Sequence, residues 1–220
     1  MTGYEVLLWV HVLLFVYWLG ADIGVFISAR SLINDKLPVP GRAIAAKILF
    51  TIDMAPRTSH VMMLPIGFSL AAATGISPIT GVWLGLVWVL GLAWLGLTWY
   101  IRFKTGTVPG RTAERFDVWF RAILVLVLIA TGLVSLITDA PFSENWLALK
   151  IGLFGIIVAS GAGIRLTLKP FGPAFAQLVS DGPSPEVNDT LRSAMRRSYP
   201  FVFTIWSLVA LLALLGIAKP

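Results

Sequence analysis

The sequence contains no cysteine and only two histidines among its 220 residues. Without cysteine, the chain can form neither a disulfide nor a thiolate-bound metal or iron–sulfur centre, so the remaining metal ligands are histidine, methionine, carboxylates and lysine. Charged residues are also scarce, at 13%, whereas hydrophobic residues make up 57%. A soluble domain carries about 25% charged residues. The mean hydropathy of +0.85 agrees, and the composition indicates an integral membrane protein.

Basic residues outnumber acidic ones, and the formal net charge is +6. The Lys and Arg residues fall in short loops between apolar segments, a pattern that orients membrane helices and contacts anionic lipid headgroups. A nucleic-acid-binding protein gathers such residues into one patch or stripe. We therefore expect the lipid bilayer, and no nucleic acid, as a partner.

Several apolar segments are long enough to cross a bilayer, which takes about 20 residues per helix. They cover residues 5–29, 46–74, 81–102, 118–138, 146–168 and 200–218. A proline-rich loop, residues 169–199, separates the last two and is expected to contain a short amphipathic helix from Pro185 to Arg197. The sequence predicts an all-α, polytopic integral membrane bundle of six transmembrane helices in a single domain, residues 1–220.

Lys and Arg are concentrated in the first, third and fifth loops, and the second and fourth loops contain neither. Because positively charged loops stay on the cytoplasmic side, loop 169–199 is expected to be cytoplasmic. Both termini are then non-cytoplasmic. A bacterial inner (plasma) membrane is the expected location.

The second apolar segment contains an unusual set of polar side chains. A charge at the bilayer centre costs about 3 kcal/mol or more unless it is paired, hydrated or functional. Asp53, Arg57 and His60 follow one another at steps of four and three, so they share one helical stripe. We expect Arg57 to pair with Asp22 of the first segment, or with Asp53, or with a haem propionate. Alternatively, the ion pair only fixes helix packing.

The two histidines lie in different predicted spans, the simplest arrangement for axial ligation of a b-type haem. His11 and His60 are thus the candidate iron ligands. For straight helices, their depths differ by about 9 Å, and tilting or kinks at Pro56 and Pro65 must absorb this difference. Otherwise the two do not ligate the same iron, and His11 binds alone or opposite another group. Alternatively, both histidines merely form hydrogen bonds between helices.

A copper or small-solute permease is a second hypothesis. Met62 and Met63 follow His60 closely, and thioether and imidazole ligands suit copper(I). Asp22 and Asp53 would then act as relay carboxylates. Methionines in membrane helices also serve simply as packing residues.

Lys150 lies inside the fifth segment, in WLALKIGLF, at about the depth of His11. It either extends outward past Trp146 to the interface or meets a propionate, a quinone oxygen or a substrate carboxylate beside His11. Trp18 is deeper than an interfacial tryptophan and either lines a cofactor or packs between helices.

Two short motifs resemble those of a known family. HVLLFVYWLG, with His11 seven residues before Trp18, is similar to the first helix of the HemJ-type protoporphyrinogen oxidases and their CopD-like relatives. NWLALKIGLF resembles a second signature of that family and maps the family's lysine onto Lys150.

Further along the chain, an arginine fifteen residues after this lysine, Arg165, and a last helix opening at Tyr199–Pro200 are also similar to the family. The resemblance covers residues 5–28 and 118–218. The hairpin that contains IDMAPRTSH has no counterpart in the family.

This resemblance implies a compact helical bundle that holds a haem b through His11. It also implies that Lys150 is important for activity and that a porphyrinogen is oxidised with transfer of electrons to membrane acceptors. His60 has no position in the family pattern. The end of the first helix, GVFISAR, also departs from the aromatic-rich end that the family has.

The leading hypothesis is a membrane-embedded, b-type haem oxidoreductase that relays electrons between a small substrate or quinol and another carrier. His11 and His60 are its candidate metal ligands, and Trp18 lies beside the cofactor. Arg57 and Lys150 neutralise propionates or orient the substrate, and are the candidate catalytic residues. A third hypothesis is a haem-binding anchor subunit of a larger redox complex. A quinone is a candidate second cofactor, and either a homo-oligomer or a redox partner subunit is a candidate assembly.

Overall fold

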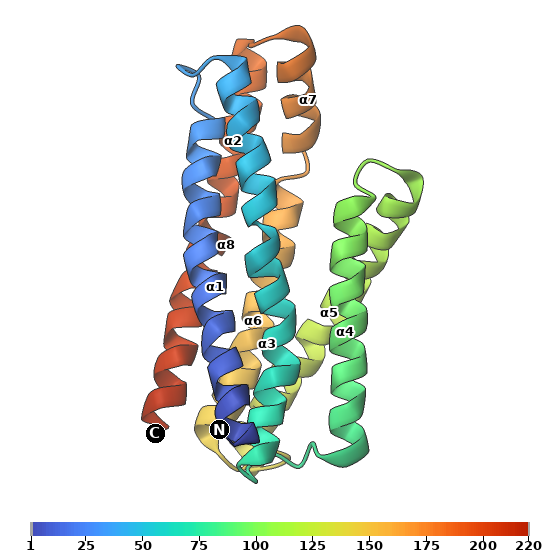
Figure 1. Cartoon of the computed structure of the whole chain (residues 1–220), viewed down its shortest axis with the longest axis vertical. Helices are drawn as coiled ribbons and strands as arrows, with labels where there is room; N and C mark the ends of the chain where they lie inside the picture. The colour runs from blue at the N-terminus through green and yellow to red at the C-terminus, as the bar shows by residue number, and fades with distance from the viewer. Residues whose placement is uncertain (1, 220) are drawn as a thin grey trace.

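The structure of the protein, a computed structural model, describes residues 2–219. Its regular elements in this range are all helices (Figure 1). They are α1 (Gly3–Leu32), α2 (Val39–Ile52), α3 (Met54–Ala73), α4 (Gly81–Phe103), α5 (Val108–Thr138), α6 (Asn145–Thr167), α7 (Phe171–Asp181) and α8 (Pro185–Ala218). The predicted all-α bundle is confirmed.

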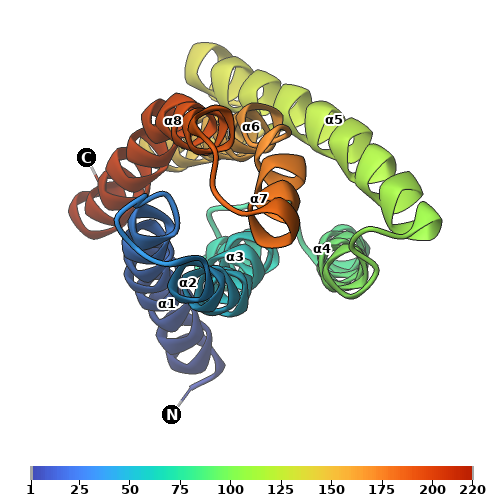
Figure 2. The same cartoon turned by 90° about the horizontal axis from the view of Figure 1, so that it is seen from above.

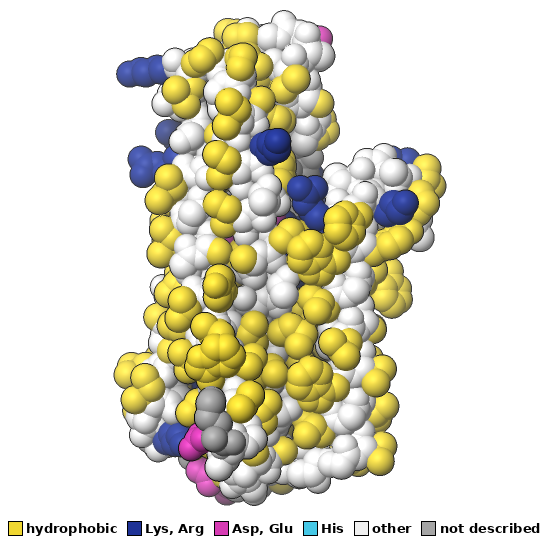
Figure 3. Space-filling model, in the orientation of Figure 1, with side chains coloured by type: hydrophobic (Ala, Val, Ile, Leu, Met, Phe, Trp, Pro, Cys, Tyr) yellow, Lys and Arg dark blue, Asp and Glu magenta, His cyan; other side chains and the backbone are white. Residues whose placement is uncertain are grey.

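Five helical segments in the described range are long and apolar enough to cross a membrane: α1, α4, α5, α6 together with α7, and α8. The more polar α3 lies between α1 and α4 and contacts both. Hydrophobic side chains cover much of the outer surface in Figure 3, as expected for a face in contact with lipid. Both ends of the chain lie at the same end of the bundle, opposite α7 (Figure 1).

The predicted second span, residues 46–74, is not one helix. It is divided at Asp53 into α2 and α3. Pro56 explains the break, because its ring cannot donate to the carbonyl of Ile52 and clashes with that carbonyl in a continuous helix. Within α3, Pro56 occupies the first turn, where a missing N–H costs little.

The starts of α5 and α8 also differ from the prediction, because each helix begins with charged turns that lie outside the apolar span. α5 begins at Val108, ten residues before the predicted span, and Thr107 caps it by accepting a hydrogen bond from the Gly110 N–H. α8 is continuous from Pro185 to Ala218, so the predicted amphipathic helix and last span are one helix. Loop 169–199 is therefore mostly helical, since it also contains α7. At 1.5 Å per residue, the 34 residues of α8 extend about 20 Å beyond a 30 Å hydrocarbon core.

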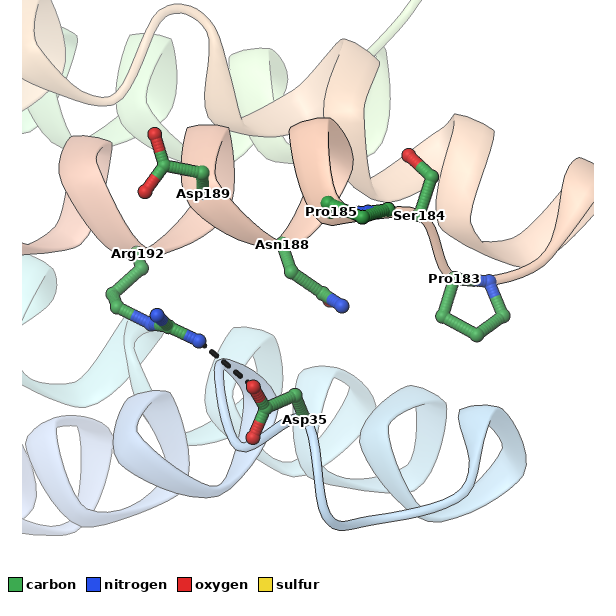
Figure 4. A pocket seen from close by; sticks show the side chains of 7 residues that line it. All are labelled: Asp35, Pro183, Ser184, Pro185, Asn188, Asp189 and Arg192. Atoms are coloured by element: carbon green, nitrogen blue, oxygen red, sulfur yellow. Dashed lines mark hydrogen bonds and ion pairs between the residues drawn. The ribbon is translucent and has the colours of Figure 1, made fainter.

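This extension has its own small core, formed where the ends of α1, α2, α7 and α8 meet (Figure 2). Arg42 is fully buried there and donates from Nε to the Leu32 carbonyl at 2.7 Å and from Nη1 to Asn188 Oδ1 at 2.8 Å. A polar cleft lies beside it, where Arg192 and Asp35 form an ion pair of 2.9 Å (Figure 4). These contacts hold the end of the bundle together.

Close approaches between α5, α6 and α8 give the rest of the bundle a rigid frame. A Cβ added to Gly132 would lie 2.7 Å from the backbone of Gly152, so α5 and α6 are in direct backbone contact. Gly163 of α6 likewise accommodates the ring of Phe201 of α8, which would lie 2.5 Å from an added Cβ. This frame positions the α6 and α8 walls of the cavity described next.

Candidate functional site

A cavity of about 650 Å³ lies in the half of the bundle that carries the termini, among α1, α3, α6 and α8. Its walls are aliphatic and aromatic. The polar side chains that reach it are few: His11, Thr74, Glu144, Lys150 and Lys219. Sites for drug-sized ligands and cofactors are typically apolar, with a small number of polar groups, and measure about 300–1,000 Å³. This cavity has both properties.

The cavity forms where α1 and α8 separate. In the other half of the bundle, these helices are joined by Phe26, whose ring packs at 5.3–5.8 Å from those of Tyr199, Phe203 and Trp206. Trp206 also donates from Nε1 to Asp22 at 2.7 Å. Beyond these aromatic contacts, both helices line the cavity.

His11 is the one histidine in the cavity wall. Its Nδ1 atom is buried and has no hydrogen-bond partner. Gly67 of α3 packs beside this ring, and a Cβ added to Gly67 would lie 3.6 Å from the His11 Cε1 atom. Leaving a buried polar atom unpaired costs about 1–3 kcal/mol, so such atoms are usually satisfied by a partner. The Nε2 atom of the same ring is not fully buried and forms no hydrogen bond within the described residues, so it is the nitrogen that a ligand in the cavity would reach.

Lys150 reaches the same cavity from α6, as the shared depth with His11 predicts. Its Nζ atom lies 5.8 Å from the centre of the Trp146 ring, and the Nζ atom of Lys219 lies at the same distance from this ring. Gly216 provides the necessary space, because an added Cβ would lie 2.7 Å from Lys150 Nζ. Within the described residues, neither lysine forms an ion pair with a carboxylate. With Glu144 in the same lining, the two lysines leave one more positive than negative charge at the cavity.

His60 lies behind the cavity wall. Its ring is 4.9 Å from that of Trp18 and 5.4 Å from that of Phe154, and both of these rings line the cavity. The pairs Trp18–His60 and His11–Gly67 define the register of the antiparallel helices α1 and α3. The levels of His11 and His60 then differ by seven residues, about 10 Å. The depth mismatch expected for straight helices persists, and only His11 of the two lines the cavity. The Nε2 atom of His60 is also buried and unpartnered.

The residues of the copper hypothesis do not converge on one space either. Met63 lines the cavity, whereas Met62 and His60 do not. Among residues 2–219, no group of three or more His, Asp or Glu side chains is arranged to hold a metal ion.

Arg57 pairs with Asp53, at 2.6 Å, rather than with Asp22. The first choice of partner was therefore wrong, because Asp22 faces α8 and accepts its hydrogen bond from Trp206. The second choice is present: Asp53 and Arg57 are four residues apart, within reach of each other on adjacent helical turns. Arg57 does not line the cavity, so the structure does not bring it to His11 and Lys150.

Sequence reasoning missed a buried ion network centred on Asp117 of α5. This fully buried carboxylate accepts hydrogen bonds from Arg121 Nε at 2.8 Å, from Arg165 Nη1, and from Trp94 Nε1 at 3.0 Å. Arg121 also lies over the Trp94 ring at 4.9 Å. The spacing of four between Asp117 and Arg121 was a usable signal, but the predicted span began at residue 118.

Comparison of the chain with protein-family models, with curated proteins and with solved structures finds no match. The resemblance to the HemJ-type oxidases thus remains a prediction from the motifs around His11 and Lys150.

Proposed function

We propose that the protein is a membrane-embedded b-type haem oxidoreductase in which the cavity binds the haem and His11 is its axial ligand. The observation that carries this proposal is the imidazole of His11, which has no hydrogen-bond partner among the described residues and lines an apolar cavity of cofactor size. A free imidazole nitrogen is the common protein ligand of haem iron. Met63 lines the same cavity and would be the candidate for a second ligand. His60 is not a ligand in this proposal.

The charges of the cavity suit an amphipathic, anionic ligand. Haem b carries two propionates on an apolar macrocycle, and Lys150 and Lys219 offer two ammonium groups beside apolar walls. Carboxylates near these lysines would complete ion pairs that the chain itself does not supply.

Bound haem would supply one-electron chemistry, and the protein would set position and dielectric. Trp18 and Phe154 form the part of the cavity wall that separates it from His60. Lys150 orients a carboxylate or a quinol oxygen at the cavity. The electron donor is thus a small anionic substrate or a quinol, with porphyrinogen oxidation as the narrower possibility, and a carrier or partner subunit takes the electrons.

The location of the cavity sets where the substrate arrives. Its half of the bundle carries both termini, and the charge of the loops favours a non-cytoplasmic position for this half, in a bacterial inner membrane. A substrate would therefore enter from the outer leaflet or from the space beyond it.

Absorption spectra of the purified protein test the proposal. Protein expressed with ample haem should show a b-type α-band after reduction, and a quinol analogue should reduce it. Met63→Leu should shift the bands if Met63 is the second ligand, while the neighbouring Met62→Leu, off the cavity, should not. If the wild type contains no haem, the assignment is wrong. Copper binding that Met62→Leu and Met63→Leu both weaken would then favour the permease.

A further inference from the structure

The charged groups between α3, α5 and α6 do not neutralise one another. Asp117 is a single carboxylate shared by two guanidinium groups, those of Arg121 and Arg165. Within the described residues, no other carboxylate lies within 4 Å of either arginine's nitrogen atoms. The neighbouring pair Arg57–Asp53 is itself neutral. Among these contact pairs, three guanidinium groups share two carboxylates, and Glu114 of α5 acts on Arg165 only from beyond contact distance.

This surplus charge lies at the edge of the bilayer. Arg165 is in the last turn of α6, and on α5 the uninterrupted apolar run begins directly after Arg121. α6 spans 23 residues, or about 34 Å, close to the thickness of the hydrocarbon core. The arginines are thus at the level of lipid headgroups, at the end of the bundle opposite the termini.

The same region is open on one side. The α4–α5 hairpin stands away from the upper part of the bundle, and the surface is hollowed between them, with Lys and Arg side chains gathered in the notch (Figure 3). The Arg165 side chain is 25% exposed and that of Arg57 41% exposed. α3 and α6, which carry these two residues, have no close backbone contact with each other in the described range. Beside Arg57, α4 is joined to α3 by a hydrogen bond of 3.2 Å from Trp99 Nε1 to Thr58.

A surplus guanidinium at the membrane boundary requires a counter-charge, because an uncompensated charge at low dielectric is costly. We propose that the notch between α3, α6 and the α4–α5 hairpin binds the phosphate of an anionic phospholipid, with Arg165 and Arg57 as its contacts. The lipid source follows from the apolar side chains at the notch, where Trp99 and Phe103 of α4 are exposed, and from the hydrophobic surface that continues below it (Figure 3). This site is separate from the His11 cavity and does not depend on haem.

Thermal unfolding of delipidated protein in a neutral detergent tests the proposal. Titration with phosphatidylglycerol should raise the midpoint temperature more than phosphatidylcholine does, because a ligand that binds only the folded state stabilises it. One basic residue near an anionic surface contributes about a fivefold change in affinity. Arg165→Gln and Arg57→Gln should therefore each raise the half-saturating concentration of phosphatidylglycerol by about fivefold. Arg192→Gln, which removes another exposed arginine at the same end, is the matched control and should leave it unchanged.

Equal stabilisation of the wild type by both lipids would overturn the proposal, as would an unchanged preference in both variants or an equal loss in Arg192→Gln. If inorganic phosphate alone stabilised the protein as much as phosphatidylglycerol, the site would bind a free anion and the lipid assignment would be wrong. Should Arg165→Gln fail to fold, Arg57→Gln decides the outcome, because its partly exposed ion pair is not part of the buried network.

Discussion

Replacing Asp117 by Asn should destabilise the protein far more than the same replacement at Asp53. Both carboxylates pair with an arginine four residues later, but Asp117 is fully buried and holds three donors, while Asp53 pairs with a side chain that is 41% exposed. Removing one partner of a buried ion pair costs about 3–5 kcal/mol, whereas an exposed pair within a helix contributes about 0.3–0.5 kcal/mol. For a chain of this size, 1 kcal/mol corresponds to about 2–4 °C in the midpoint of thermal unfolding.

Asp117→Asn should thus lower the midpoint by roughly 10 °C, and Asp53→Asn by about 1 °C. The assay is thermal unfolding of purified protein in one detergent, followed by circular dichroism at 222 nm. The double variant Asp117→Asn/Arg165→Gln should recover part of the loss, because one of the two unpaired guanidinium groups is also removed. Equal, small shifts for the two single variants would show that the network is hydrated and would refute this reasoning.

The packing and the topology give three further expectations. Gly132→Ala should reduce the yield of folded protein because its Cβ would lie 2.7 Å from backbone atoms of α6, while Gly96→Ala, with open space around it, should not; equal yields would contradict the close contact. Trp206→Phe should lower the thermal midpoint by several degrees, because it leaves an Asp22 oxygen without its donor, at a cost of about 1–3 kcal/mol; no shift would mean that water replaces the indole. Reporter fusions at both termini and near Pro78 should give non-cytoplasmic signals. A cytoplasmic signal at Pro78 would contradict the predicted orientation in the membrane.

The apolar segments were predictable because the length of a spanning helix is set by the bilayer. The helix boundaries were not, because a run of charged residues ends an apolar window without ending a helix. For this reason, the prediction places the first ten residues of α5 in a loop and separates the amphipathic start of α8 from the last span. Pro56 indicated the break at Asp53, because a proline removes the hydrogen bond to the carbonyl four residues before it and clashes with that carbonyl.

The features of the candidate site that depend only on the depth of a residue along its helix could be predicted. His11 and Lys150 were expected at one level and reach one cavity, and the expected difference in depth between His11 and His60 persists. The partner of Arg57 was not predictable, because it depends on the rotation of α1 about its axis, which turns Asp22 toward Trp206 of α8.

The haem content of the His11→Ala and His60→Ala variants, measured as reduced pyridine haemochrome per polypeptide, tests the central claim most directly. The wild type should contain haem, His11→Ala should retain little, and His60→Ala should keep it with an unchanged α-band, because His60 lies behind Trp18 and Phe154 rather than in the cavity. The thermal midpoint of each variant serves as the control for folding. Full haem occupancy in a folded His11→Ala variant, together with loss of haem in His60→Ala, would contradict the account.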